Sequence, residues 1–371
     1  MKILVTGGAG FIGSHLVDAL VADGQSVRVL DSLDPQVHGV NADWPAHANS
    51  RAEYQRGDVR DREAVRRALE GVEVVYHQAA AVGVAQSMYE IEAYVSANSL
   101  GAGVVLQEVV ARKGQIARMV VASSMSIYGE GAYVDADGKP AAPGLRPDAQ
   151  LEKHEWELRD ERGRGLRPLG TPETKPLLPT SVYAVTKRDH EELFLAVGNA
   201  YRIPTVALRY FNVYGSRQAL SNPYTGVAAI FSSRLLNRKP PLVTEDGQQS
   251  RDFVHVSDIV RANLLALRCD AAGGRVCNVG TGRPTTIARI AELLAGRLGL
   301  EIAPEVTGRF RAGDIRHCFA DPTHARRTLG FEARVRLEDG IDEVIAFVRA
   351  QQPEDKVDGF EAELVNRGLA R

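Results

Sequence analysis

Tyr183 and Lys187 lie four positions apart in Ser181-Val182-Tyr183-Ala184-Val185-Thr186-Lys187, near the start of a helix-length segment. In a helix this spacing places both side chains on one face, one turn apart. A phenol has a pKa near 10, and lowering it by about three units corresponds to roughly 4 kcal/mol, which a neighbouring ammonium helps to supply. The pair is therefore a candidate proton donor and acceptor, although the same spacing also arises by chance on helix surfaces.

A serine-rich turn supplies a hydroxyl that could act with this pair. The strand-like run Arg118–Ala122 is followed by Ser123-Ser124-Met125-Ser126. Ligands of parallel α/β folds bind beyond the carboxyl ends of the strands, so we expect Ser124 to face the same crevice as Tyr183. A capping or turn role is the alternative for Ser124, and it is a stronger alternative for Ser123 and Ser126.

The N-terminal strand pattern runs directly into a glycine-rich turn, Gly7-Gly8-Ala9-Gly10-Phe11-Ile12-Gly13, that opens a helix. Gly7 permits the tight turn, Gly10 lets the backbone approach a pyrophosphate, and Gly13 lets the helix lie close to the sheet. The start of the helix, including Phe11 and Ile12, offers free N–H groups and the positive end of the helix dipole. The order of strand, glycines and helix predicts a dinucleotide site.

The acid Asp31 follows the next strand-like run, Val27–Leu30. A carboxylate at this position accepts hydrogen bonds from the adenosine ribose and repels a 2′-phosphate, and no arginine follows at Ser32-Leu33, so NAD is favoured over NADP. Asp58 and Val59 stand where a loop could reach the adenine, with a plain turn as the alternative.

The elements that must position these residues alternate between strands and helices. The expected strands are compact, apolar and bounded by turn formers: Ile3–Thr6, Ser26–Leu30, Val72–His77, Arg118–Ser123, Thr205–Tyr210 and Arg275–Val279. Helix-length stretches such as Gly13–Ala22 and Val185–Ala200 lie between them. This pattern predicts an α/β fold with a Rossmann-like, doubly wound parallel sheet.

Two regions interrupt the alternation. Residues 132–179 are rich in Gly, Pro and charge, with one possible helix around Ala149–Arg162, and we expect an insertion near the site. We assign residues 1–212 and about 255–280 to an NAD-binding domain, and about 213–254 and 281–350 to a smaller α+β substrate-binding lobe. The tail, 351–371, is expected to be a surface helix or partly ordered, without a functional role.

Composition excludes several classes of function. With 45 Lys+Arg against 47 Asp+Glu, the formal charge of -2 gives no general attraction to nucleic acid or anionic membranes. Cys269, Cys277 and Cys318 form no CxxC pair and no metal-ligand spacing, so we expect no metal and reduced thiols. No secretory signal or membrane-length apolar run is present, and we expect a cytoplasmic protein.

Several motifs together resemble the extended short-chain dehydrogenase/reductases, in particular the NAD-dependent nucleotide-sugar epimerases and dehydratases, from Met1 to about Ala350. The motifs are TGGAGFIG, GDVRD, HQAAAVGV, SSMSIYG, SVYAVTK, LRYFNVYG, the run from Asp246 to Asp258, NVGTG and RAGDIRH. The resemblance implies that Tyr183 is the catalytic acid and base. It implies that Lys187 grips the nicotinamide ribose, and that Ser124 shares the proton path with the sugar hydroxyl.

The resemblance also separates reactions within the group. Dehydratases carry an Asp-Glu pair after the serine that matches Ser124, and decarboxylases carry a Glu where Ser126 stands, whereas this chain has Met125 and Ser126. Both of those reactions are therefore disfavoured, because neither side chain is an acid or base at neutral pH. The expected reaction is 4-epimerisation, in which Tyr183 removes the proton of the C4 hydroxyl, hydride passes to NAD, and the keto-sugar turns before hydride returns.

Arginines suit a diphosphate because the guanidinium fork bonds two oxygens at once. By resemblance, Arg251 and Arg311 contact the diphosphate and Asn212 contacts phosphate or sugar, with surface ion pairs and an Asx turn as the alternatives. Met125, Ser126 and the segment 222–226 are candidate lining of the sugar site. His255 is expected to be a hydrogen-bonded structural histidine.

The substrate and the assembly are expectations from resemblance alone. The long stretch between Tyr128 and Tyr183, with Gln218–Phe231, resembles bacterial epimerases that act at C4 of deoxythymidine-diphosphate-linked L-rhamnose. Uridine-linked hexoses or hexuronic acids are the alternative substrates, and a dehydratase, decarboxylase or ketoreductase is the alternative enzyme. The resemblance also implies a homodimer packed through the helix after Tyr183 and the one around Gly101–Ala111.

Overall fold

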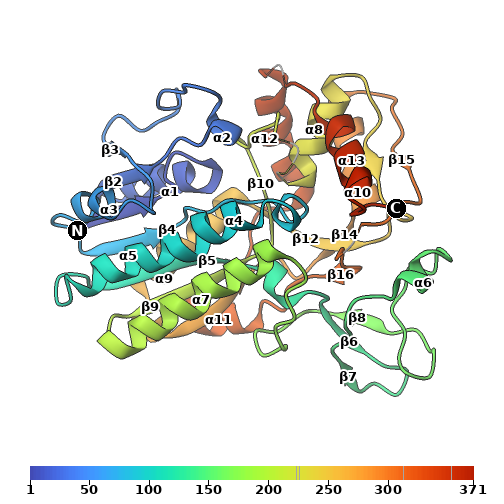
Figure 1. Cartoon of the computed structure of the whole chain (residues 1–371), viewed down its shortest axis with the longest axis horizontal. Coiled ribbons are helices and arrows are strands. Elements are labelled where there is room, and N and C mark those ends of the chain that lie inside the picture. The colour runs from blue at the N-terminus through green and yellow to red at the C-terminus, as the bar shows by residue number, and fades with distance from the viewer. Residues whose placement is uncertain (223, 225, 312, 352) are drawn as a thin grey trace.

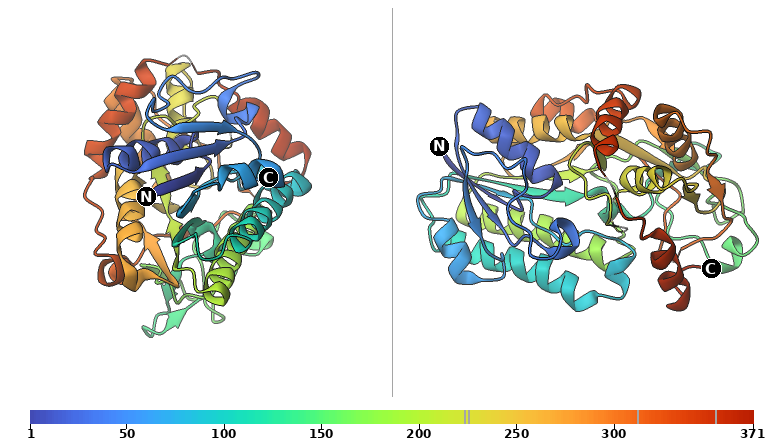
Figure 2. Two further views of the ribbon diagram at one scale, coloured as in Figure 1. Left: turned by 90° about the vertical axis from the view of Figure 1, so that its left-hand side faces the viewer. Right: turned by 90° about the horizontal axis from the view of Figure 1, so that it is seen from above.

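The computed structural model describes residues 1–222, 224, 226–311, 313–351 and 353–371. A seven-stranded parallel sheet lies at its centre (Figures 1 and 2). The strands, in spatial order, are β13 (Arg275–Val279), β9 (Thr205–Tyr210), β5 (Arg118–Ser124), β4 (Val74–His77), β1 (Lys2–Thr6), β2 (Ser26–Asp31) and β3 (Glu53–Arg56). The Rossmann-like α/β prediction is confirmed, and all six expected strands belong to this sheet.

Helices cover both faces of the sheet. Ile3 and Val5 face one side of β1 and Leu4 faces the other, and all three are fully buried. The first side packs against α1 (Phe11–Ala22), α9 (Val256–Arg268) and α11 (Thr323–Leu329). The second side packs against α3 (Arg62–Ala68), α5 (Gly101–Val110) and α7 (Val182–Tyr201). Burial on both faces explains why these strands are continuous apolar runs rather than alternating ones.

A second, smaller lobe adjoins the carboxyl ends of the strands. Its sheet contains β10 (Asn212–Tyr214), β12 (Ser250–His255), β14 (Pro284–Thr286) and β16 (His317–Cys318), and β11 (Leu242–Val243) pairs separately with β15 (Glu305–Val306). Its core is shared by α8 (Val227–Leu236), α10 (Ile287–Leu298) and α12 (Leu337–Arg349). Although α11 falls within the range expected for this lobe, it packs on the central sheet.

The insertion folds as a small three-stranded sheet of β7 (Pro140–Ala141), β6 (Ala132–Val134) and β8 (Arg167–Leu169), at the lower right of Figure 1. The helix expected over Ala149–Arg162 is wrong, because α6 spans only Asp148–Leu151. Beyond it the chain turns back on itself, with the Leu166 N–H donating to the Leu158 carbonyl at 2.8 Å. Leu158 and Leu166 are thereby buried against Tyr133.

Short elements connect these layers, and the tail ends in a helix. They are α2 (Pro35–His38), a 3-10 turn (Gln86–Met88), α4 (Ile91–Tyr94), a π-helical turn (Val95–Leu100), two further 3-10 turns (Met125–Tyr128 and Asp270–Ala272) and α13 (Val357–Asn366). Among the described residues, none of the helices combines the length and apolar character needed to cross a membrane.

Candidate active site

The glycine turn has the shape that the sequence predicts. Gly7 adopts φ +70°, and a Cβ there would lie 2.7 Å from the Ala79 nitrogen. A Cβ on Gly13 would lie 2.1 Å from the Gly7 oxygen, so only glycine lets α1 start this close to the sheet. At Gly10, by contrast, the nearest atom to an added Cβ is the Gly7 oxygen at 3.4 Å. Little within the chain requires glycine there, which fits a ligand that approaches the backbone.

Asp31 links the glycine turn to the loop after β2. Its carboxylate accepts hydrogen bonds from the Ala9 N–H at 2.9 Å and from the Leu33 N–H at 3.0 Å. Each oxygen keeps a further lone pair, as two ribose hydroxyls require. The first turn of α1, which includes Phe11 and Ile12, follows Ala9 in the chain and has no side-chain cap at Gly10, so its N–H groups are open to a ligand. The donors and the acid therefore fit the pyrophosphate and ribose of a dinucleotide.

The Gly13→Ala variant is expected to bind NAD about a hundredfold more weakly, because its Cβ must displace either the turn or the start of α1. Titration of the NAD-depleted protein measures the loss. Gly296→Ala in α10 is the matched control, since an added Cβ there meets nothing within 4 Å. Equal affinities for the two variants would contradict the role given to Gly13.

Asp58 and Val59 make contacts within their own turn. Asp58 accepts from the Arg60 N–H at 2.8 Å and pairs with the Arg60 guanidinium at 2.6 Å, which holds the pKa of the carboxyl below its usual value. Val59 is buried, and its side chain blocks the space beside Gly101. The turn is thus well defined, and a contact with adenine stays a prediction.

The N-terminus of α7 holds the phenol. Ser181 caps the helix by accepting from the Ala184 N–H, and the Tyr183 N–H donates to the Ser87 hydroxyl at 3.0 Å. The ring of Tyr94 meets that of Tyr183 edge-on, with 6.5 Å between centroids. Burial raises the pKa of Tyr183, and the Ser124 hydroxyl acts in the opposite direction. The phenolate therefore needs added positive charge before Tyr183 can act as a base.

Lys187 lies one turn further along α7 and is only 3% exposed. Burial lowers its pKa to about 7. Its Nζ lies 3.3 Å from Nδ1 of His190, and no carboxylate in the described part of the chain pairs with it. A buried ammonium without a counter-ion is costly, so the site is suited to a phenolate and to ribose hydroxyls that can accept from Lys187.

Ser124 ends β5 opposite Tyr210 and also caps the turn that follows. Its oxygen accepts from the Ser126 N–H at 3.2 Å and from the Ser126 hydroxyl at 2.9 Å. Ser126 thus holds the hydroxyl of Ser124 in place. Met125 is buried in the core cluster, so packing accounts for it and its contact with a sugar stays a prediction.

Two buried histidines behind Lys187 were not predicted from the sequence. His77 donates to or accepts from the Thr6 hydroxyl at 2.9 Å, and its ring lies 4.9 Å from that of His190. Complete burial, with Lys187 nearby, lowers the pKa of His77 to about 3 and that of His190 well below 6.5. Both rings are therefore neutral at physiological pH.

The free energy of unfolding is expected to fall as the pH drops below 6.5. Between pH 6.5 and about 3 the unfolded chain protonates His77 and the folded chain does not. Stability is therefore lost toward acid, by about 1.4 kcal/mol per pH unit for this histidine. Urea unfolding at pH 6 and pH 5 should show a steeper loss in the wild type than in His77→Phe. Equal losses would contradict a neutral, buried His77.

Two of the expected anchors, Asn212 and Arg251, lie on neighbouring strands of the second lobe. β10 runs beside β12 with Asn212 opposite Phe253, and among the described residues the buried Asn212 Oδ1 has no hydrogen-bond partner. Arg251 donates to the carbonyls of Ser250, Ile315 and Arg316 at 2.7–3.0 Å and pairs with no described carboxylate. Its positive charge is therefore available to an anion.

Arg311 lies in the segment before β16, two positions before Gly313. The Thr180 hydroxyl donates to the Gly313 carbonyl at 3.0 Å, which joins Gly313 to the segment just before the Tyr183 helix. Unlike Arg251, Arg311 already has an anionic partner, Glu361 of α13. His255 is the structural residue that we expected: it caps α9 through Ser257 and pairs with Glu343 at 3.2 Å. Pro223 and Thr225 of the segment 222–226 lie outside the described residues.

The sequence and the fold of this chain are similar to those of several known proteins. The model of the NAD dependent epimerase/dehydratase family matches residues 3–147 and 163–280. A dTDP-L-rhamnose 4-epimerase from Burkholderia thailandensis is 36% identical over 94% of each chain. Solved structures of UDP-glucose 4-epimerases from Thermotoga maritima, with UDP-glucose, and Thermus thermophilus, with NAD, have TM-scores of 0.77 and 0.73. They are 32% and 30% identical, and each match covers 94% of this chain and 99% of the other.

Proposed function

Because the chain belongs to the NAD-dependent epimerase/dehydratase family, we propose that it interconverts two C4 epimers of a nucleotide-linked sugar. The observation that carries this proposal is that the Ser124 hydroxyl, at the end of β5, acts on the phenol of Tyr183, with the buried Lys187 one turn further along the same helix. A phenol, a buried ammonium and a strand-end hydroxyl form the set that alcohol oxidation and carbonyl reduction need, and these are the two halves of an epimerisation.

In this mechanism the chain moves one proton and holds the sugar. Bound NAD supplies the reversible acceptor of hydride at C4. Tyr183 takes the proton of the C4 hydroxyl, and the charge of Lys187 stabilises the phenolate and lowers its pKa. Ser124 donates to the sugar oxygen, which orients it toward Tyr183. The same phenol returns the proton after the sugar has turned, so no net proton is exchanged.

Residues that bind the diphosphate explain how the keto-sugar can rotate in the active site without dissociating. Arg251 and Arg311 provide positive charge, and the buried Oδ1 of the half-buried Asn212 provides an acceptor that no other described residue occupies. A diphosphate held there tethers the sugar while the glycosidic and phosphate bonds rotate.

A dehydratase is the second candidate, and the geometry around Ser124 disfavours it. Elimination of water needs an additional acid and base beside the sugar. Met125 is buried in the core, and the Ser126 hydroxyl donates to Ser124. Neither residue supplies the missing groups.

We propose dTDP-L-rhamnose and its 4-epimer, dTDP-6-deoxy-L-talose, as the substrate pair. The dTDP-L-rhamnose 4-epimerase described above supports this choice, as do the insertion and the segment Gln218–Phe231. UDP-linked hexoses and hexuronic acids are the alternatives. A 6-deoxy sugar carries a methyl group where a hexuronate carries a charge, so the two classes place opposite demands on the sugar pocket.

The experiment that tests this function incubates the purified protein with a panel of thymidine- and uridine-linked sugars, without added NAD or NADH. Mass spectrometry and NMR then identify the products. An epimerase brings one substrate to a fixed ratio of isomers of equal mass. Loss of 18 mass units, the mass of water, identifies a dehydratase, and failure to turn over without NADH identifies a reductase.

We also propose a homodimer formed through α5 and α7, which lie side by side in Figure 1. Exposed apolar side chains on or beside these helices support it: Val95, Leu100, Val185 and Leu193. Sedimentation of the wild type and of Leu193→Lys tests the interface, because a charge at its centre should produce monomers.

A further inference from the structure

The C-terminal helix α13 contacts both lobes. Phe360 and Leu364 pack with Ala85 and Tyr89, from the segment after β4, and with Tyr224 of the second lobe. The hydroxyls of Tyr89 and Tyr224 lie 2.9 Å apart, and the Phe360 and Tyr224 rings meet edge-on with 5.1 Å between centroids. This helix therefore lies across the boundary at which the cofactor-binding and substrate-binding parts meet.

Ion pairs fix the first turn of α13 on the second lobe. Asp358 pairs with Arg234 of α8 at 2.6 Å and with Lys239 at 2.8 Å. At the end of the chain, Phe310 and Arg371 exchange two backbone hydrogen bonds of 3.0 Å. The helix is thus held at both ends, next to the loop that carries Arg311.

Arg311 contacts two side chains of α13. Its guanidinium pairs with Glu361, and its Cζ lies 5.4 Å from the centre of the Phe360 ring. The Glu361 side chain is 12% exposed and that of Arg311 is 29% exposed. A carboxylate of the chain itself therefore neutralises one of the two arginines expected to bind a diphosphate.

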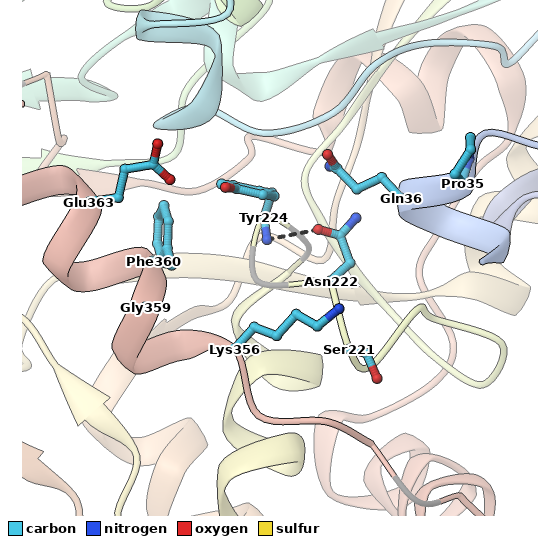
Figure 3. Close-up of a pocket in the computed structure, with 9 residues that line it drawn as sticks. All are labelled: Pro35, Gln36, Ser221, Asn222, Tyr224, Lys356, Gly359, Phe360 and Glu363. Atoms are coloured by element: carbon cyan, nitrogen blue, oxygen red, sulfur yellow. Dashed lines mark hydrogen bonds between the residues drawn. The ribbon is translucent and has the colours of Figure 1, made fainter. Parts of the chain in front are cut away.

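A cavity of about 360 Å³ is lined on one side by α13, including Phe360, whose ring Arg311 also contacts (Figure 3). Its walls come from three parts of the chain, and the residues are Pro35, Gln36, Ser221, Asn222, Tyr224, Lys356, Gly359, Phe360 and Glu363. Gln36 is hydrogen-bonded to Gln86, which accepts from the Tyr94 hydroxyl, and the Tyr94 ring meets Tyr183. The cavity is therefore connected to the phenol through a short series of side-chain contacts.

We propose that α13 is the outer wall of the nucleotide-sugar site and that Glu361 holds Arg311 until the diphosphate of the substrate replaces it. The inference rests on the proposed function, because it takes Arg311 as a diphosphate ligand. A diphosphate carries more charge than a carboxylate and offers more oxygens to the guanidinium fork. Phe360, Tyr224 and the amides of Gln36 and Asn222 offer the aromatic and hydrogen-bonding surfaces that a nucleoside requires.

Replacing Glu361 with glutamine tests whether its carboxylate and the diphosphate compete for Arg311. Isothermal titration of the NAD-containing protein with dTDP and with UDP gives the affinities. Glu361→Gln should bind whichever diphosphate the wild type prefers about fivefold more tightly, since a single partly exposed ion pair no longer has to be broken. Glu292→Gln is the matched control: it removes one exposed carboxylate of α10, which pairs with Arg289 at 3.8 Å and does not line the cavity, and it should change nothing.

The same substitution made in an Arg311→Ala protein shows whether the gain in diphosphate affinity depends on Arg311. In Arg311→Ala, which should bind the diphosphate more weakly, the added Glu361→Gln change should give no further gain. An affinity of Glu361→Gln equal to or below that of the wild type overturns the inference, as does the same gain in the Arg311→Ala background. If Glu361→Gln shows the gain but no sugar is epimerised, the proposed reaction fails while the role of α13 stands. If neither diphosphate binds any of these proteins, both are overturned.

Discussion

Replacing Tyr183 with phenylalanine is expected to reduce epimerisation at least about a thousandfold, which corresponds to roughly 4 kcal/mol of lost transition-state stabilisation. The change removes a single oxygen atom, and with it the group that takes and returns the C4 proton. The Tyr183 backbone contact with Ser87 and the edge-on packing against Tyr94 do not involve that oxygen. Product formation under saturating substrate, followed by NMR, measures the loss.

The matched control lies on the same helix. Tyr201 at the end of α7 is 44% exposed, and Tyr201→Phe should retain full turnover. Both variants should also retain NAD, as measured by the cofactor released on denaturation. Substantial turnover by Tyr183→Phe would remove this residue from its role as acid and base.

The second large effect concerns stability, and it arises from Arg316. Its side chain is 1% exposed and pairs with Glu157 at 2.6 Å, Glu245 at 2.9 Å and Asp246 at 2.7 Å. Glu245 is itself buried and also binds Arg146 at 2.7 Å. Arg316→Ala leaves the buried Glu245 with one fewer cation, whereas Glu157 and Asp246 are partly exposed. The loss at Glu245 should lower the free energy of unfolding by about 3 kcal/mol.

This network joins the insertion to the substrate-binding lobe, so the loss should be cooperative. Urea unfolding of Arg316→Ala measures it, with Arg289→Ala as control. Arg289 is exposed and pairs with Glu292 at 3.8 Å, so its removal should cost less than about 0.5 kcal/mol. Equal costs for the two variants would show that the network does not hold the insertion in place.

The central sheet could be predicted from the sequence because its strands are buried on both faces. In a chain of alternating elements, short uninterrupted apolar runs such as Ile3-Leu4-Val5 are typical of buried parallel strands. The edge strand Glu53–Arg56 was missed, since it is polar and only partly buried. The helix expected over Ala149–Arg162 failed for a different reason: Glu157 binds Arg316, far away in the sequence, and Leu158 turns inward.

Contacts between distant segments also limited what the sequence could predict about the site. Tyr183, Lys187, Ser124 and the glycine turn carry spacing signals that are local in the chain. The structure places Tyr183 and Lys187 on one helix, with the Ser124 hydroxyl acting on the phenol. The contacts that hold them, such as Ser87 with Tyr183 and Asn98 with Thr186, join segments about 90 residues apart and leave no local pattern. The pairing of Glu361 with Arg311 is of this kind.

The most direct test of the proposed chemistry follows a deuterium label at C4 of the sugar that the protein converts. If hydride leaves C4 and returns to the same carbon, the epimeric product retains the label at C4, with the configuration inverted and the mass unchanged. In deuterated water, unlabelled substrate should likewise gain no deuterium at C4. Loss of the label to solvent, or uptake of solvent deuterium at C4, would contradict a mechanism in which Tyr183 moves only the hydroxyl proton.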